Sequence, residues 1–75
     1  MKHETAYLAE ASEWRRRARE NLTISHVWRY LGDADTADCV IYRYRVCIGN
    51  CRRNLRWARE ARQERQMWRP RAGVP

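Results

Sequence analysis

Apolar residues recur at intervals of three and four positions through most of the chain, and this spacing constrains the fold more than any other feature. In the first segment the repeat passes through Tyr7, Ala11, Trp14, Ala18, Leu22, Ser25 and Trp28. Such intervals place side chains on one face of an α-helix, which completes a turn in about 3.6 residues. The pattern therefore predicts a long amphipathic helix over residues 5–31.

A glycine and several aspartates interrupt the repeat. Gly32 can adopt the left-handed conformation that ends a helix. Asp35 or Thr36 is suited to cap the N-terminus of a second helix. Residues 32–35 are therefore expected to form a tight turn.

A second run with the same spacing follows this turn. It passes through Ile41, Tyr44, Ile48, Cys51, Leu55 and Ala58, after which Arg62 and Arg65 continue on the same face. Pro70 sets the latest end of a helix, because its ring blocks continuation. We expect a second helix over about residues 36–68, so that residues 1–69 form an all-α, antiparallel two-helix hairpin and residues 70–75 a flexible tail.

Residues 40–48 support a competing interpretation. They are rich in β-branched and aromatic side chains, and the pair Gly49 and Asn50 that follows is a turn signal. In this helix-strand-helix alternative, strands from two chains pair across a dimer. The helical interpretation is favoured because the apolar repeat continues through Cys51, although Gly49 costs a helix interior about 1 kcal/mol relative to alanine.

Two helices alone cannot cover the large side chains that they carry. A chain of 75 residues buries only about 60% of the surface that it exposes when unfolded. The side chains expected in the core or in a dimer interface are Tyr7, Trp14, Leu22, Trp28, Ile41, Tyr44, Ile48 and Leu55. Pairing two hairpins into a four-helix bundle would cover their flanks, at about 25 cal/mol for each Å² buried. The sequence therefore predicts a homodimer.

Arginine is concentrated in the second half of the chain. The net charge is +7, and all but one of the 16 basic residues are arginines. Ten arginines lie in residues 43–71, whereas Glu60 and Glu64 are the acidic residues of residues 39–75. A GC-rich genome would explain arginine in place of lysine, but it would not explain this segregation. Because guanidinium groups form bidentate contacts and stack on rings, the second half is expected to form a binding surface.

Aromatic residues accompany these arginines. Tryptophan, tyrosine and arginine are the residues most enriched at the energetic centres of protein interfaces. The expected partner-binding residues are Tyr42, Arg45, Arg52, Arg56, Trp57 and Arg59. They predict a small regulator or inhibitor that acts by contact with the acidic surface of a larger protein.

Nucleic acid is the alternative partner. The residues expected to contact its phosphates are Arg52, Arg53, Arg56, Arg62, Arg65 and Arg69. The sequence has no base-reading motif, so recognition would depend on shape and charge and would weaken steeply with salt. Many charged helix faces only keep a protein in solution, but a net charge of +7 on 75 residues favours a binding role.

Catalytic and metal-binding functions are not expected. The histidines, His3 and His26, belong to no catalytic motif, and two helices offer little enclosure for a reaction. A Cys3His zinc site can be drawn from Cys39, Cys47, Cys51 and His26, but these thiols follow the spacing of small packing residues. We therefore predict no enzyme activity, no cofactor and no metal.

The remaining features concern location. The sequence shows neither an apolar run of the roughly 20 residues needed to span a membrane nor a secretory signal. Its three cysteines are an odd number, which does not suit a secreted fold held together by disulfides. A cytoplasmic protein is expected, without a membrane partner. The layout is similar in outline to small plasmid- and phage-encoded helical hairpins that dimerise and bind RNA or a host protein, a likeness of shape alone.

Overall fold

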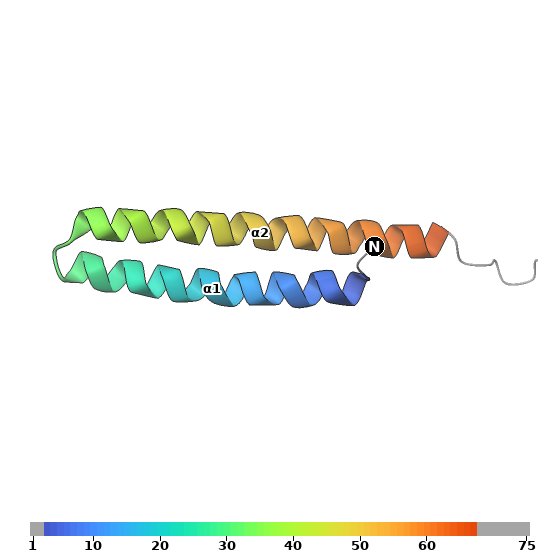
Figure 1. Cartoon of the computed structure of the whole chain (residues 1–75), viewed down its shortest axis with the longest axis horizontal. Helices are drawn as coiled ribbons and strands as arrows, with labels where there is room; N and C mark the ends of the chain where they lie inside the picture. The colour runs from blue at the N-terminus through green and yellow to red at the C-terminus, as the bar shows by residue number, and fades with distance from the viewer. Residues whose placement is uncertain (1–2, 68–75) are drawn as a thin grey trace, which may run out of the picture.

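The computed structural model describes residues 3–67, which form two long antiparallel helices joined by a tight turn (Figure 1). Helix α1 spans Glu4–Tyr30 and helix α2 spans Ala34–Met67. The predicted helical hairpin is confirmed, with helix ends that differ from the predicted ones by one or two residues. The last turns of α2 extend beyond the start of α1, because α2 has 34 residues and α1 has 27. The predicted tail, residues 70–75, lies outside the described residues.

The strand alternative for residues 40–48 is wrong, because this segment lies inside α2. Gly49 is also helical, and a Cβ atom built there would meet nothing within 4 Å. A helix can bury the apolar residues on both sides of Gly49 against α1. That packing outweighs the helix-weakening effect of one glycine.

Gly32 ends α1 as predicted. Its φ angle is 87°, in the left-handed region, and its N–H donates to the carbonyl of Arg29 at 3.1 Å. The N–H of Asp33 donates to the carbonyl of Trp28 at 3.0 Å. These two bonds satisfy carbonyl groups that the end of a helix leaves unpaired.

Asp33 caps α2, so the prediction of Asp35 or Thr36 as the cap is wrong. One Asp33 carboxylate oxygen accepts the Thr36 backbone N–H at 3.0 Å, and the other accepts the Thr36 hydroxyl at 2.7 Å. These bonds, the backbone one first, hold the pKa of the Asp33 carboxyl below its ordinary value. The cap lies earlier than predicted because Asp33 directly follows Gly32, and α2 can therefore begin at Ala34.

Both helices meet along a seven-residue repeat typical of a coiled coil. In heptad notation, position a holds Glu4, Ala11, Ala18 and Ser25 in α1, and Ala37, Tyr44, Cys51, Ala58 and Arg65 in α2. Position d holds Tyr7, Trp14, Asn21 and Trp28 in α1, and Val40, Cys47, Asn54 and Ala61 in α2. We call these a and d positions the seam. Near the turn the Ser25 hydroxyl donates to the Ala37 carbonyl at 3.0 Å, and at the open end Arg65 pairs with Glu4 at 2.9 Å.

The buried part of the seam consists of small residues. The buried side chains are Ala11, Ala18, Ser25, Ala37, Val40, Cys47, Cys51, Asn54 and Ala58. Small side chains let two helices approach closely, but they remove little apolar area from water. The seam therefore buries little apolar area.

Large apolar residues are only partly buried, both at seam positions (Tyr7, Trp14, Trp28 and Tyr44) and beside the seam. Of the side chains predicted for the core or a dimer, the half-buried ones are Tyr7, Trp14, Leu22, Ile41, Tyr44 and Ile48. Trp28 and Leu55 are exposed, at 38% and 37% of their surface. Two closely spaced helices cannot enclose side chains this large, so the hairpin presents apolar surface to the solvent along its sides.

Candidate functional site

The hairpin has two long edges, one on each side of the seam. Because the helices run in opposite directions, equivalent heptad positions of both helices fall on the same side. Positions b and e form one edge, where Arg29 and Asp38 lie 3.4 Å apart. Positions c and g form the other, where the ring of Trp57 lies 5.7 Å from that of Tyr7 at the neighbouring seam. The two edges carry different side chains.

The first edge combines aliphatic residues with arginines, and we call it the cationic edge. Its aliphatic residues are Leu8, Leu22, Ile41, Ile48 and Leu55. Its arginines are Arg15, Arg19, Arg29, Arg45, Arg52, Arg59 and Arg62. Asp38 is its one carboxylate within residues 3–67, and it pairs with Arg29. The other six arginines form no ion pair with any described residue.

The second edge mixes charges of both signs, and we call it the mixed edge. Its glutamates are Glu10, Glu13, Glu20, Glu60 and Glu64, and its arginines are Arg17, Arg43 and Arg53. The predicted pair of Glu13 and Arg17 is confirmed at 3.3 Å. Arg16, on the adjoining outer face of α1, pairs with both Glu13 and Glu20. Hydrogen bonding from Arg16, the largest effect, holds the pKa of the Glu13 carboxyl below its ordinary value.

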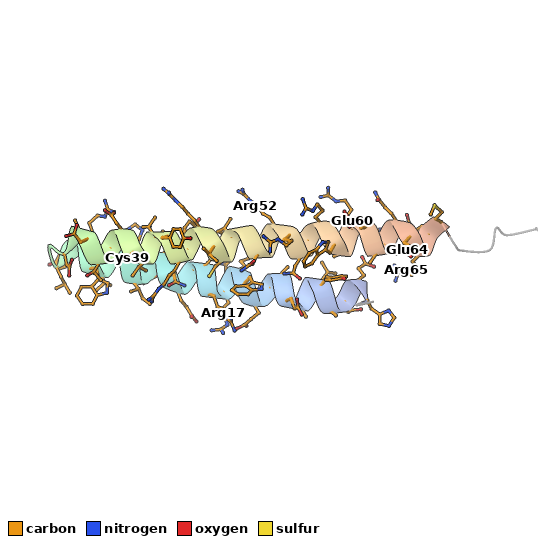
Figure 2. All side chains as sticks on the ribbon, turned by 45° about the horizontal axis from the view of Figure 1, so that its top comes forward. Arg17, Cys39, Arg52, Glu60, Glu64 and Arg65 are labelled. Atoms are coloured by element: carbon orange, nitrogen blue, oxygen red, sulfur yellow. The ribbon has the colours of Figure 1, made fainter. Side chains whose placement is uncertain are left out.

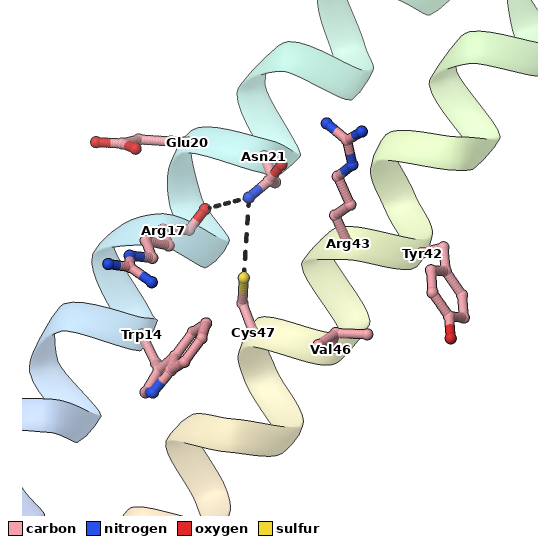
Figure 3. A pocket seen from close by; sticks show the side chains of 8 residues that line it. All are labelled: Trp14, Arg17, Glu20, Asn21, Tyr42, Arg43, Val46 and Cys47. Carbon is pink, nitrogen blue, oxygen red and sulfur yellow. Dashed lines mark hydrogen bonds between the residues drawn. The ribbon is translucent and has the colours of Figure 1, made fainter.

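An apolar hollow of about 450 Å³ opens in the mixed edge (Figure 3). Its walls are Trp14, Arg17, Glu20 and Asn21 from α1 and Tyr42, Arg43, Val46 and Cys47 from α2. The Arg17 guanidinium lies 4.9 Å from the centre of the Trp14 ring, a cation–π contact. The Asn21 amide donates to the Arg17 carbonyl at 2.8 Å. The hollow could receive an apolar side chain of a second copy of the chain.

A smaller hollow of about 260 Å³ lies on the outer face of α2, the side turned away from α1. Arg52, Arg53 and Arg56 surround it, and Gly49 leaves it open because a glycine has no Cβ. Figure 2 shows Arg52 pointing away from α1. Guanidinium groups gathered in this way can bind phosphate or carboxylate oxygens.

The predicted partner-binding residues do not lie on a single face. Arg45, Arg52 and Arg59 follow one row along α2, at successive b positions of the cationic edge. Tyr42 and Arg56 lie on the outer face, and the Tyr42 side chain is 69% exposed.

Trp57, in contrast, lies on the mixed edge and packs against Tyr7. A tryptophan outside the apolar repeat of its own helix can still find a neighbour on the other helix. The sequence carries no local signal for such a contact.

The arginines predicted to contact nucleic acid are also divided. Arg52, Arg53 and Arg56 gather around the hollow at Gly49, as described above. Arg62 lies on the cationic edge, and Arg65 donates to Glu4 at 2.9 Å. Arg69 lies outside the described residues.

Sequence reasoning missed the contribution of α1 to the cationic edge. Leu8, Arg15 and Arg19 were not among the predicted site residues, yet they share the edge with the arginine row of α2. The signal that could have found them is the heptad register. Writing both helices in register shows that b and e positions carry arginines and aliphatic residues in each of them.

The cysteines serve mainly as packing residues. Cys47 and Cys51 are buried in the seam, whereas Cys39 is exposed. Across residues 3–67, no group of three His, Cys, Asp or Glu side chains is placed to hold a metal ion. Neither α1 nor α2, over its described length, is apolar enough to cross a membrane.

Comparison with known proteins gives no relative from which a function could be transferred. The chain matches no protein family model, no curated protein and no solved structure.

Proposed function

We propose that this protein is a small, non-enzymatic regulator or inhibitor that binds an acidic surface of a larger protein. One observation carries the proposal: most arginines of α2 have no ion-pair partner among the described residues. These are Arg43, Arg45, Arg52, Arg53, Arg56, Arg59 and Arg62. A surface of one charge attracts a partner of the opposite charge and rejects others.

The two helices also differ in how far their own carboxylates neutralise their arginines. In α1, Arg16 and Arg17 pair with glutamates of their own helix. In α2, Glu60 and Glu64 are too few to neutralise the arginines around them. The carboxylates that would balance α2 are therefore expected to come from another molecule.

A capture experiment tests this proposal. The full chain is immobilised and exposed to a nuclease-treated bacterial lysate, next to a variant with Arg45→Ala, Arg52→Ala and Arg59→Ala. We expect the wild-type chain to retain an acidic protein that the variant does not retain. Equal retention by both chains would show that this arginine row is not the binding surface.

We also propose that two hairpins pair through their mixed edges to form a four-helix bundle. Pairing through the cationic edges would bring unpaired arginines of both copies together, which is unfavourable. The mixed edge carries both signs of charge, and Ile24, Val27 and Val46 there are about half exposed. Trp28 at the neighbouring seam adds a partly exposed ring. Sedimentation equilibrium of the purified chain tests this, and a monomer at about millimolar concentration would rule it out.

The hollow at Gly49 favours nucleic acid as a second candidate partner. Arg52, Arg53 and Arg56 could contact one phosphate group there. Gel shifts with duplex DNA and single-stranded RNA at low and moderate salt distinguish this candidate, because phosphate contacts weaken steeply with salt. An Arg53→Ala variant sharpens the test, since Arg53 lines the hollow but lies outside the cationic edge.

A further inference from the structure

The aliphatic residues of the cationic edge form a stripe that the described residues cover only in part. Ile41, Ile48 and Leu55 follow one another at intervals of seven residues along α2, which is about 10 Å per step. Leu8 and Leu22 contribute from α1. Leu8 is 44% exposed and Leu55 is 37% exposed. The stripe therefore keeps apolar surface in contact with water along most of the hairpin.

Arginines border this stripe on both helices. Arg45, Arg52 and Arg59 form a parallel row on α2, at b positions just outside the aliphatic e positions. Arg15 and Arg19 lie on the α1 side. An apolar strip bordered by fixed positive charge fits a partner surface that has an apolar strip bordered by carboxylates.

A second copy of the chain does not have that chemistry at this edge. Two cationic edges face to face would bury the aliphatic stripes of both copies. They would also bring together, from each copy, six arginines that have no ion pair within residues 3–67. Nucleic acid matches the charge but not the apolar surface, because phosphates would pair with the arginines and leave the aliphatic stripe without an apolar partner. An acidic amphipathic helix satisfies both requirements.

We propose that the cationic edge is a docking site for one amphipathic helix of the partner protein. This inference rests on the proposed function and names the part of the partner that is bound. The apolar face of the helix lies along Leu22, Ile48 and Leu55, and its flanking aspartates and glutamates pair with the arginines that border the stripe. The row from Arg45 to Arg59 is about 21 Å long, so a docked helix of about four turns would contact all of it.

Designed peptides test the chemistry of the occupant directly. The probe is a fluorescent amphipathic peptide of about 18 residues, with leucines at helical spacing and glutamates on both flanks. The control peptide keeps the leucines and replaces each glutamate with lysine. Fluorescence anisotropy with the full chain measures both affinities. We expect the glutamate peptide to bind at least about tenfold more tightly, and the absence of saturable binding would overturn the inference.

Matched variants locate the binding. Ile48→Gln and Arg52→Glu alter the aliphatic stripe and the arginine row, whereas Val46→Gln and Arg53→Glu make the same changes on the mixed edge. The first pair is expected to weaken peptide binding about tenfold each, and the second pair about twofold or less. Circular dichroism shows which variants keep the helices. If Ile48→Gln does not, Arg52→Glu and Arg53→Glu decide the location alone.

Other outcomes separate the inference from the proposed function. Loss of binding in Arg52→Glu but not in a folded Ile48→Gln variant would indicate contact by charge alone, which removes the docked helix and leaves the acidic partner. Tighter binding of RNA or duplex DNA than of the peptide, through the same arginines, would overturn both. Dissociation of a dimer by Ile48→Gln would show that a second copy occupies the edge, and would overturn the inference.

Discussion

The two edges of this hairpin are built on the same seam, yet they differ in both charge and apolar chemistry. The cationic edge has aliphatic residues and six arginines without an ion pair among the described residues. The mixed edge has glutamates and arginines together, and the aromatic contact of Tyr7 with Trp57. Under the proposed function, carboxylates of a partner protein pair with the arginines of the first edge, whereas the glutamates and arginines of the second edge can pair within one chain or between two copies.

Under the two proposals above, dimerisation and partner binding use separate surfaces. In a twofold dimer of hairpins the same surface of both copies forms the interface, so the charges of that surface must be compatible with those of an identical surface. Recognition of an acidic partner needs a positively charged surface, and two such surfaces repel each other. One small hairpin could meet both conditions only if charge is segregated across the seam, and the heptad positions of its arginines are consistent with this requirement.

Placing a larger side chain in the seam should have the largest effect on stability, because both edges depend on the close approach of the helices. Ala18 is 1% exposed, and Ala18→Leu would force the helices apart. Overpacking of this kind lowers the free energy of unfolding by about 3 kcal/mol. Thermal denaturation followed by circular dichroism measures the loss. Ala9→Leu, on the exposed outer face of α1, is the control and should change stability by less than about 0.5 kcal/mol.

Removing one ring beside the mixed edge should have the next largest effect, and it should affect one edge only. Trp28 is 38% exposed and is expected to be buried between two hairpins. Trp28→Ala should weaken the dimer by about 2 kcal/mol, or about thirtyfold in the dissociation constant. Sedimentation equilibrium gives this constant. Leu22→Ala on the cationic edge should leave it unchanged, and an equal loss there would abolish the distinction between the edges.

The sequence predicted the number of helices, their order, the stop at Gly32 and the pair of Glu13 with Arg17. These features depend on local spacing and on backbone chemistry, which one segment is sufficient to define. The cap at Asp33 was missed because three neighbouring residues could each serve as caps, and the start of α2 selects one of them.

The position of the seam in α2 could not be predicted in the same way. The repeat that includes Ile41, Ile48 and Leu55 follows positions a and e, whereas the structure buries positions a and d, with Val40, Cys47 and Asn54. Both sets of positions have the spacing of one helical face. The choice between them depends on which side chains let the helices approach, and the smaller ones do. The aliphatic residues Ile41, Ile48 and Leu55 of the cationic edge were therefore assigned to the core or a dimer interface, and its arginines to partner binding.

A smaller effect is expected for the amide buried in the seam. Asn54 is 4% exposed, and its side-chain oxygen accepts no hydrogen bond from any residue in the described part of the chain, although its amide nitrogen donates to the Asn50 carbonyl at 2.9 Å. An unpaired buried acceptor lowers stability, and alanine also favours the helix. Asn54→Ala should therefore raise the free energy of unfolding by about 1 kcal/mol in thermal denaturation. Binding of the glutamate peptide should not change, because Asn54 lies on neither edge.

The smallest expected effect is the acid dependence of the mixed edge, where ion pairs lower the pKa of Glu13. Since the folded chain holds this pKa below its value in the unfolded chain, the stabilisation is fully present above the ordinary value of 4.5. It is lost as the pH falls through the lowered pKa. Glu13→Gln should therefore lower the melting temperature by a few degrees near neutral pH, and the difference from the wild type should vanish towards about pH 2. Glu60→Gln, on the same edge but without an ion pair to any described residue, is the control. A constant difference at all pH values would mean that Glu13 stabilises the hairpin by packing rather than by charge.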